Sequence, residues 1–182
     1  PKRGHDHHDV DPAAALKRRL TGILGADADV VITAAEHVSS DFDARFSAVW
    51  RRYRYRIADD ATPPNPLRRF DTAHVAGRLD VDAMQAAADT VLGLREFATF
   101  CKARDEATTI RELHQFDWER DSDGVVVATL QADAFCHSMV RALVGGCVAA
   151  GTRRFEPTHL GELQAAATRT SEFVVMPAHG LT

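Results

Sequence analysis

The sequence has no long apolar segment. No run approaches the ~20 consecutive apolar residues that a membrane-spanning helix requires, and the first residues, PKRGHDHHD, are too polar for a signal peptide. With 45% hydrophobic and 26% charged residues, the composition is typical of a globular protein. A length of 182 residues suffices for one ordinary domain, or for one domain and part of another. Because the sequence begins with Pro1 and stops directly after an apolar turn, we expect a piece of a longer protein.

Cysteine is scarce and unevenly spaced. The three cysteines, Cys101, Cys136 and Cys147, form no C-x-x-C pair, and an odd number cannot pair completely. This pattern argues against a disulfide framework and against a cysteine zinc site. It predicts a protein of the reducing cytoplasm in which Cys136 is a small, buried apolar residue.

Lysine is scarce as well. The chain has 19 Arg but only three Lys, and its formal net charge is −4. A net negative charge argues against binding of a polyanion by the whole surface, so any contact with nucleic acid must be local. Many arginines beside many alanines are typical of a GC-rich genome, and arginine content alone therefore indicates no function.

The segment 42–57, FDARFSAVWRRYRYRI, concentrates positive charge and aromatic rings. It holds five arginines and two tyrosines, and it is predicted to form one long strand over 46–58. Alternation along a strand places on one face Arg51, Tyr53, Tyr55 and Ile57, and on the other Arg52, Arg54 and Arg56. Guanidinium groups pair with phosphates and tyrosine rings stack on unpaired bases, so RNA is the predicted ligand. The competing interpretation of the arginine face is a sheet edge protected by charge.

The remaining pattern predicts an α+β protein. Capping residues before apolar positions at helical spacing indicate helices, and the turn 121–124 between two apolar stretches indicates a hairpin. The expected helices are 12–25, 81–93, 136–150 and 157–168, the expected strands are 29–36, 46–58, 108–120 and 125–134, and the expected buried stripe of the first helix is Leu16, Leu20, Ile23 and Leu24. We therefore expect an antiparallel β-sheet with helices packed on one face.

Two clusters combine residue types that are common in reactive sites. The cluster from His5 to Asp9 consists of metal-ligand types, but a dedicated site also needs distant ligands, and a solvated loop is the simpler interpretation. Cys136 and His137 are adjacent, so their side chains point apart and do not form a nucleophile–base dyad. Neither cluster predicts a site.

The start of the predicted helix 136–150 is a better candidate. His137 and Arg141 lie four residues apart and share a helix face, near the N-terminus where the helix dipole favours anions. They form either a phosphate-binding edge or the polar edge of a core helix. Gly145 and Gly146 in the same helix each cost about 1 kcal/mol of helix propensity, which predicts the close approach of another element.

Basic residues also surround the loop that enters the hairpin. They are Lys102, Arg104 and Arg111, and their charge is nearly balanced by Asp105 and Glu106. The sequence leaves open whether this loop contacts phosphates or is only solvated.

Four segments together resemble one family. FDARFSAVWRRYRYRI, LGLREFATFCKARDEATTIREL, ADAFCHSMVRALVGG and MPAHGLT follow one another as in the tRNA pseudouridine synthase A family, and the resemblance extends from about Asp11 to Thr182. It implies a cytoplasmic, homodimeric isomerase without cofactor or metal, built from two α+β halves beside a basic cleft. It also implies conversion of uridine to pseudouridine in the anticodon stem-loop of tRNA, at tRNA positions 38, 39 and 40 in the family.

The resemblance assigns roles to residues of the matching segments. The first tyrosine of RRYRY, Tyr53, corresponds to the active-site tyrosine that contacts the flipped uracil, and the arginine of FDARF, Arg45, helps to hold the RNA. The implied RNA-binding residues are Arg51, Arg52, Arg54, Lys102, Arg111, His137 and Arg141. The nucleophile of the family is an aspartate in a GRTDAGVHA-like motif that this sequence does not contain. We therefore expect that aspartate upstream of this chain, and no activity from the chain alone.

The same resemblance implies a division of the chain. Residues 1–58 correspond to the end of an N-terminal synthase domain, 59–69 to a proline-rich crossover, and 70–182 to the C-terminal α+β domain. The alternative hypothesis, of a different class, is a stand-alone RNA-binding module without catalytic activity.

Overall fold

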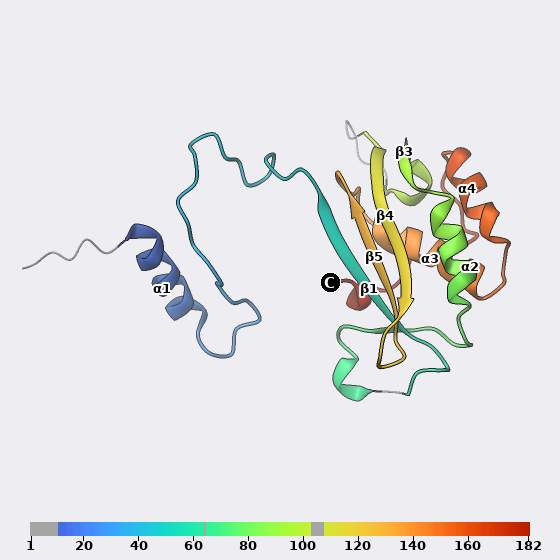
Figure 1. Cartoon of the computed structure of the whole chain (residues 1–182), viewed down its shortest axis with the longest axis horizontal. Helices are drawn as coiled ribbons and strands as arrows, with labels where there is room; N and C mark the ends of the chain where they lie inside the picture. Colours follow the sequence, from blue (N-terminus) through green and yellow to red (C-terminus); the bar gives the residue numbers. More distant parts are fainter. Residues whose placement is uncertain (1–10, 64, 103–107) are drawn as a thin grey trace, which may run out of the picture. The chain divides into compact units, whose positions relative to one another are not determined.

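The computed structural model describes residues 11–63, 65–102 and 108–182. The chain divides into two compact units, Pro1–Ser47 and Ala48–Thr182 (Figure 1). Within the described ranges, no helix is both long and apolar enough to cross a membrane.

The first unit contains the predicted N-terminal helix. Helix α1 spans Pro12–Leu24, and the Asp11 carboxylate caps it by accepting hydrogen bonds from the backbone of Ala13 and Ala14. The expected buried stripe is wrong, because Ala13 is the buried residue of α1, whereas the side chains expected inside are exposed: Leu16, Leu20, Ile23 and Leu24. The expected strand 29–36 is also wrong; the described part of this unit offers no second strand with which it could pair.

The second unit is built on a mixed sheet of five strands. Its strands are β1 (Arg51–Ala58), β2 (Ala73–His74), β3 (Gly93–Glu96), β4 (Ile110–Arg120) and β5 (Val126–Ala132), in the order β2-β1-β5-β4-β3. The predicted hairpin is confirmed as β4 and β5, and β1 lies antiparallel to β5. The two-residue strand β2 runs parallel to β1, so the sheet is not purely antiparallel as expected. Strands as short as β2 and β3 show no periodicity in a sequence.

Strand β1 is shorter than predicted but alternates as predicted. It begins at Arg51 rather than near residue 46, and the residues before it form turns and irregular structure. Tyr55 and Ile57 are fully buried on one face, whereas Arg52 and Arg54 are exposed on the other. The alternation thus separates an apolar inner face of the sheet from a polar outer face.

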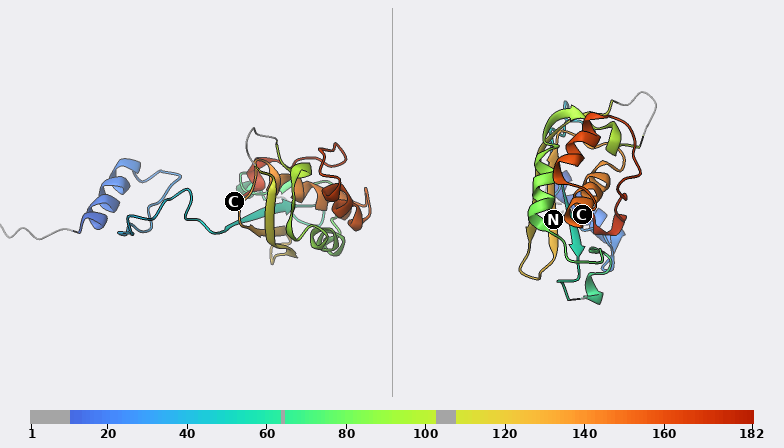
Figure 2. Two further views of the ribbon diagram at one scale, coloured as in Figure 1. Left: turned by 90° about the horizontal axis from the view of Figure 1, so that it is seen from above. Right: turned by 90° about the vertical axis from the view of Figure 1, so that its right-hand side faces the viewer.

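Three helices cover the inner face. They are α2 (Val81–Asp89), α3 (Met139–Gly151) and α4 (Pro157–Ala165), and their apolar side chains form one core with those of the inner sheet face (Figure 2). This confirms the predicted α+β architecture. The close approach predicted at the α3 glycines is confirmed too, because a Cβ on Gly145 would collide with the Val174 carbonyl and one on Gly146 with the Leu160 side chain.

Asp59, the first residue of the segment 59–69, anchors this segment to the rest of the second unit. Asp59 is fully buried, and its carboxylate accepts hydrogen bonds from Arg120 (Nη1 at 2.9 Å and Nη2 at 2.7 Å) and from the Leu79 amide at 2.8 Å. Strand β1 pairs with β5 and lies in the unit Ala48–Thr182. Assignment of 1–58 and 70–182 to two domains of a longer protein remains a prediction.

Candidate functional site

A pocket of about 400 Å³ opens where the first part of β1, the start of α3 and the C-terminal residues meet. Its lining residues are Tyr53, Phe135, Cys136, His137, Ser138, Met139, Val140, Arg141 and Leu181. None of these described residues is Asp or Glu. The pocket therefore combines aromatic, apolar and cationic groups without a negative charge of its own.

Tyr53 forms the aromatic wall of this pocket. The residue is half-buried, and its ring packs edge-on against Phe135, with ring centroids 5.3 Å apart and planes at 78°. Phe135 lies three residues after β5, the strand paired with β1, and its ring reaches Tyr53 from outside the paired stretch. Sequence reasoning assigned no role to Phe135, because the pairing of these two strands is a long-range contact.

Arg141 and His137 both line the pocket, near the start of α3. The Arg141 guanidinium donates from Nη1 to the Met176 carbonyl at 3.2 Å and from Nη2 to Ser138 Oγ at 3.3 Å. Within the described part of the chain it has no carboxylate partner. Helix α3 begins at Met139, so His137 precedes the helix instead of occupying its first turn, and its side chain is exposed.

Leu181 closes the pocket on the side of the sheet edge. It is paired with Tyr55 through an isolated antiparallel bridge, which brings the C-terminal residues alongside β1. The block MPAHGLT carried part of the family resemblance, yet sequence reasoning gave Leu181 no role. A lone apolar residue near a chain end has no periodicity from which a role could be inferred.

The arginines of β1 divide between the two sheet faces. Arg51 lies on the Tyr53 face, where its Nη1 donates to the Asp133 carbonyl at 3.4 Å. Arg52 and Arg54 lie on the outer face and do not line the pocket. Arg52 donates twice to Gln131 Oε1, at 3.0 and 2.7 Å, and Arg54 lies 3.7 Å from a Glu119 carboxylate oxygen.

The other predicted site residues are spread over the described chain. Arg45 belongs to the first unit, where its guanidinium carbon lies 5.2 Å from the Phe46 ring centre. Lys102 is exposed, and its backbone amide donates to the His137 carbonyl at 2.9 Å, which brings it beside the pocket. Arg111 is half-buried on β4 and does not line the pocket. Arg104 and the cluster His5 to Asp9 lie outside the described residues.

The structure corrects the prediction for the cysteines. Cys101 and Cys136 form a disulfide between Cα atoms 5.6 Å apart, and Cys136 is half-buried against the pocket rather than a free core thiol. The two residues are 35 positions apart, and only the folded chain brings the segment after β3 against the start of α3. Cys147 is the free, buried cysteine, and burial raises the pKa of its thiol.

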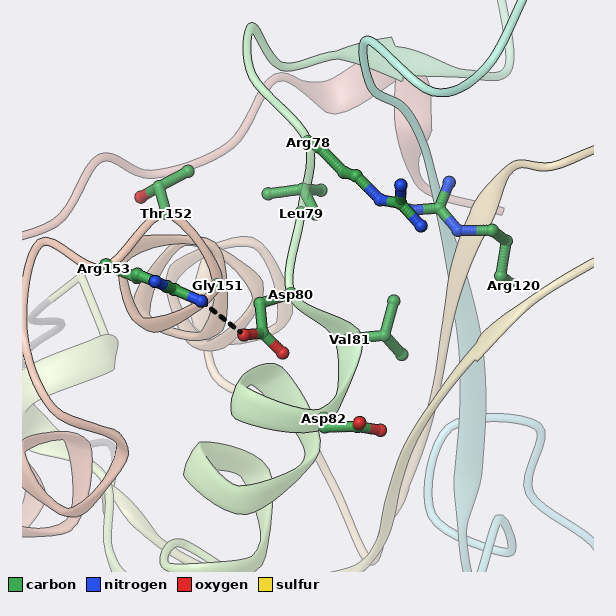
Figure 3. Close-up of a pocket in the computed structure, with 9 residues that line it drawn as sticks. All are labelled: Arg78, Leu79, Asp80, Val81, Asp82, Arg120, Gly151, Thr152 and Arg153. Atoms are coloured by element: carbon green, nitrogen blue, oxygen red, sulfur yellow. Dashed lines mark ion pairs between the residues drawn. The ribbon is translucent and has the colours of Figure 1, made fainter.

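A second pocket, of about 550 Å³, lies at the start of α2 (Figure 3). Cations and anions are interleaved there: Arg153 pairs with Asp80 at 3.6 Å, and Arg120 pairs with buried Asp59. Burial alone would raise the pKa of Asp59, but hydrogen bonds from Arg120, Leu79 and Thr62 outweigh it and lower that pKa well below its usual range. These pairs serve to join the end of β1 to α2 and β4.

A third pocket, of about 720 Å³, lies beside the 3-10 helix Pro66–Arg68. Two of its arginines are already paired, Arg56 with Asp121 at 3.2 Å and Arg68 with Asp71 at 3.1 Å. Across the described residues, no group of three or more His, Cys, Asp or Glu is placed to hold a metal ion. Of these three pockets, the one around Tyr53 combines an aromatic ring with a guanidinium that has no carboxylate partner in the described part of the chain.

Known proteins match the sequence over most of its length. The family model described as tRNA pseudouridine synthase matches residues 87–182, which include most of the pocket. Proteins named tRNA pseudouridine synthase A are 52% identical over the whole chain in Leifsonia xyli subsp. xyli, 49% over 95% of it in Cutibacterium acnes, and 46% over 96% of it in Mycobacterium leprae. The chain spans 60%, 62% and 60% of the length of these three relatives. It belongs to the tRNA pseudouridine synthase family.

Proposed function

We propose that this chain is part of an enzyme that converts uridine in tRNA to pseudouridine. We further propose that the pocket around Tyr53 forms one wall of the active site of that enzyme. The observation that carries this proposal is the meeting of Tyr53, Arg141 and Leu181, which come from three distant parts of the sequence. The relatives are named as enzymes of this activity over the whole length of the chain.

The chemistry specifies what such a site requires. The N-glycosidic bond between uracil N1 and ribose C1′ breaks, the uracil turns, and a bond forms between C5 and C1′ while the proton on C5 is lost and N1 gains one. An ionised carboxylate and an extruded base shielded from water suffice for these steps. Because none of the described residues that line the pocket is Asp or Glu, we propose that the carboxylate comes from a GRTDAGVHA-like segment upstream, and that the chain alone is inactive.

The pocket residues then have distinct roles. The Tyr53 ring stacks on the flipped uracil, and the edge of Phe135 fixes the plane of that ring. Arg141, which has no carboxylate partner among the described residues, provides a cation for the incoming carboxylate or for a backbone phosphate. Lys102 and His137, adjacent at the rim, contact phosphates of the RNA.

The Tyr53 hydroxyl also has a proposed role, as the group that shuttles the proton lost from C5. Tyr53→Phe in the whole protein separates this role from stacking, because only the hydroxyl is removed. A large loss of turnover with unchanged tRNA affinity is expected, whereas near-normal turnover would eliminate the proton role and retain stacking.

Further proposals rest on the family. They are modification in the anticodon stem-loop, at positions 38, 39 and 40, with Arg45 and the β1 arginines helping to hold the tRNA, and a cytoplasmic homodimer that needs no cofactor or metal. The competing proposal is a stand-alone RNA-binding module, and it is consistent with a pocket lining whose described residues include no carboxylate.

Release of tritium from tRNA labelled at uracil C5 decides between the two proposals. The whole protein is expected to release tritium, and the chain Pro1–Thr182 alone is expected to bind tRNA without releasing any. Turnover by the chain alone would overturn the proposal of an upstream nucleophile. An inactive whole protein that binds tRNA would favour the binding module.

A further inference from the structure

The C-terminal residues 176–182 are fastened between the two elements that carry the pocket. On the α3 side, the Met176 amide donates to the Arg141 carbonyl at 3.1 Å, and Arg141 Nη1 donates back to the Met176 carbonyl at 3.2 Å. On the β1 side, the backbone of Thr182 exchanges two hydrogen bonds with that of Arg54, at 2.8 and 2.9 Å. Leu181, which lines the pocket, lies between these two attachments.

Tyr55 lies beneath the middle of this segment. Its side chain is fully buried, and its hydroxyl donates to the Pro177 carbonyl at 2.6 Å. The backbone of Gly180 lies so close to the Tyr55 ring that a Cβ there would be 2.6 Å from Cζ and 2.7 Å from Cε1. A side chain at position 180 would therefore push the segment off the ring. Ring and hydroxyl together hold the segment at two points.

The hydroxyl is protonated at neutral pH and therefore remains a donor. Burial raises the pKa of Tyr55 to about 12, although the nearby Arg141 charge lowers it in part. A neutral, buried hydroxyl without a partner would be costly, and the Pro177 carbonyl is the partner that the structure provides.

We propose that Tyr55 is a positioning residue of the active site: through Pro177 and Gly180 it sets the place of Leu181 and of the Arg141 guanidinium against a base stacked on Tyr53. This inference rests on the proposed function. Tyr53 and Tyr55 alternate on the same face of β1, so one strand places both the stacking ring and the residue that fixes the opposite wall. The contacts of Tyr55 are with the C-terminal segment, and it does not line the pocket itself.

The test replaces Tyr55 by Phe in the whole protein. This change removes the hydrogen bond and keeps the ring. Thr99→Val is the matched control, because buried Thr99 donates a comparable hydrogen bond, to the Leu163 carbonyl at 2.8 Å, and does not line the pocket. A second variant, Gly180→Ala, keeps the hydroxyl but forces the segment away from the ring.

Turnover and tRNA affinity separate positioning from stability. In Tyr55→Phe and in Gly180→Ala we expect kcat to fall about tenfold or more, because a small displacement of a reacting group is enough for such a loss. The KM for tRNA is expected to stay within about twofold, since phosphate contacts outside the pocket dominate affinity. Thr99→Val is expected to lower thermal stability by a similar amount while leaving kcat unchanged.

Amide hydrogen exchange gives a readout that does not depend on activity. In Tyr55→Phe, the amides of Met176 and Thr182, which donate to Arg141 and Arg54, are expected to exchange about tenfold faster, and in Thr99→Val they are not. Equal kcat in Tyr55→Phe and Thr99→Val would overturn the positioning role, and so would unchanged exchange. If the wild-type whole protein forms no pseudouridine, the proposed function fails, and the exchange rates alone decide whether Tyr55 fastens the segment.

Discussion

The two faces of β1 differ in residue type and in how far their charges are satisfied. On the outer face, the guanidinium groups of Arg52 and Arg54 have partners on β5 and β4, Gln131 and Glu119. On the inner face, Tyr53 opens into a pocket with Arg141, which has no carboxylate partner among the described residues. A row of arginines that already have partners is therefore a weaker indication of a functional site than one aromatic ring beside one guanidinium without a carboxylate partner.

The largest effect is expected from breaking the ion pair between Arg120 and Asp59, the residue that directly follows β1. Arg120→Ala leaves the fully buried Asp59 carboxylate without its cation, and we expect a loss of about 3 to 5 kcal/mol in the free energy of unfolding. Urea denaturation measures it. A loss below about 1 kcal/mol would show that this pair behaves like one on the surface.

The same pair predicts how stability depends on pH. Because the folded pKa of Asp59 is lowered below its unfolded value of about 4, the stabilisation is present above about pH 4 and is lost as pH falls through the lower folded pKa. The wild type is therefore expected to lose more stability than Arg120→Ala between about pH 4 and pH 2. Parallel pH profiles of the two proteins would contradict this explanation.

The next effect concerns the disulfide beside the pocket. Closure of a loop of 35 residues by Cys101 and Cys136 is expected to contribute about 2 to 4 kcal/mol. The double variant Cys101→Ser with Cys136→Ser, compared with the wild type under oxidising and reducing conditions, measures this contribution. Its stability is expected to match that of the reduced wild type. Equal stability of the oxidised and reduced wild type would show that a disulfide between Cys101 and Cys136 does not stabilise the protein.

A third prediction compares the two faces directly through activity. Tyr53→Ala in the whole protein is expected to lower kcat about 100-fold, since stacking of a base on an aromatic ring contributes about 1 to 3 kcal/mol. Tritium release from labelled tRNA measures the change. A decrease in kcat of less than about threefold would show that stacking on Tyr53 does not contribute to the reaction.

The smallest effect is expected on the outer face. Arg54→Ala is expected to raise the KM for tRNA by at most about threefold and to leave kcat unchanged, because the exposed pair with Glu119 is weak and the side chain points away from the pocket. Measurement at two salt concentrations separates a phosphate contact from a catalytic one. A fall in kcat as large as that of Tyr53→Ala would eliminate the distinction between the faces.

Local patterns predicted the helices and the longer strands β1, β4 and β5, but not the short strands β2 and β3 or the contacts between elements. The caps at Asp11 and Asp80, the turn 121–124 and the alternation of β1 act through neighbouring residues, and the structure confirms them. The stripe of α1 failed because periodicity shows which residues can be buried, and not whether a partner is there to cover them. Strand 29–36 failed for the same reason.

The candidate site was predictable only in part. Spacing singled out His137 and Arg141, the resemblance assigned a role to Tyr53, and alternation gave the face on which Tyr53 lies. The places of Phe135, Leu181 and the disulfide partner of Cys136 depend on long-range contacts, which no short-range pattern reports. Long-range contacts of this kind became visible only in the folded chain.

The most direct test of the central claim is a photochemical cross-link from the target base. An anticodon stem-loop that carries 4-thiouridine at the modified position, irradiated with the whole protein, is expected to cross-link to the pocket residues around Tyr53. The cross-link is expected to disappear in Tyr53→Ala and to persist in Arg54→Ala at saturating RNA. A cross-link that is retained in Tyr53→Ala and lost in Arg54→Ala would place the uracil on the outer face and contradict the account.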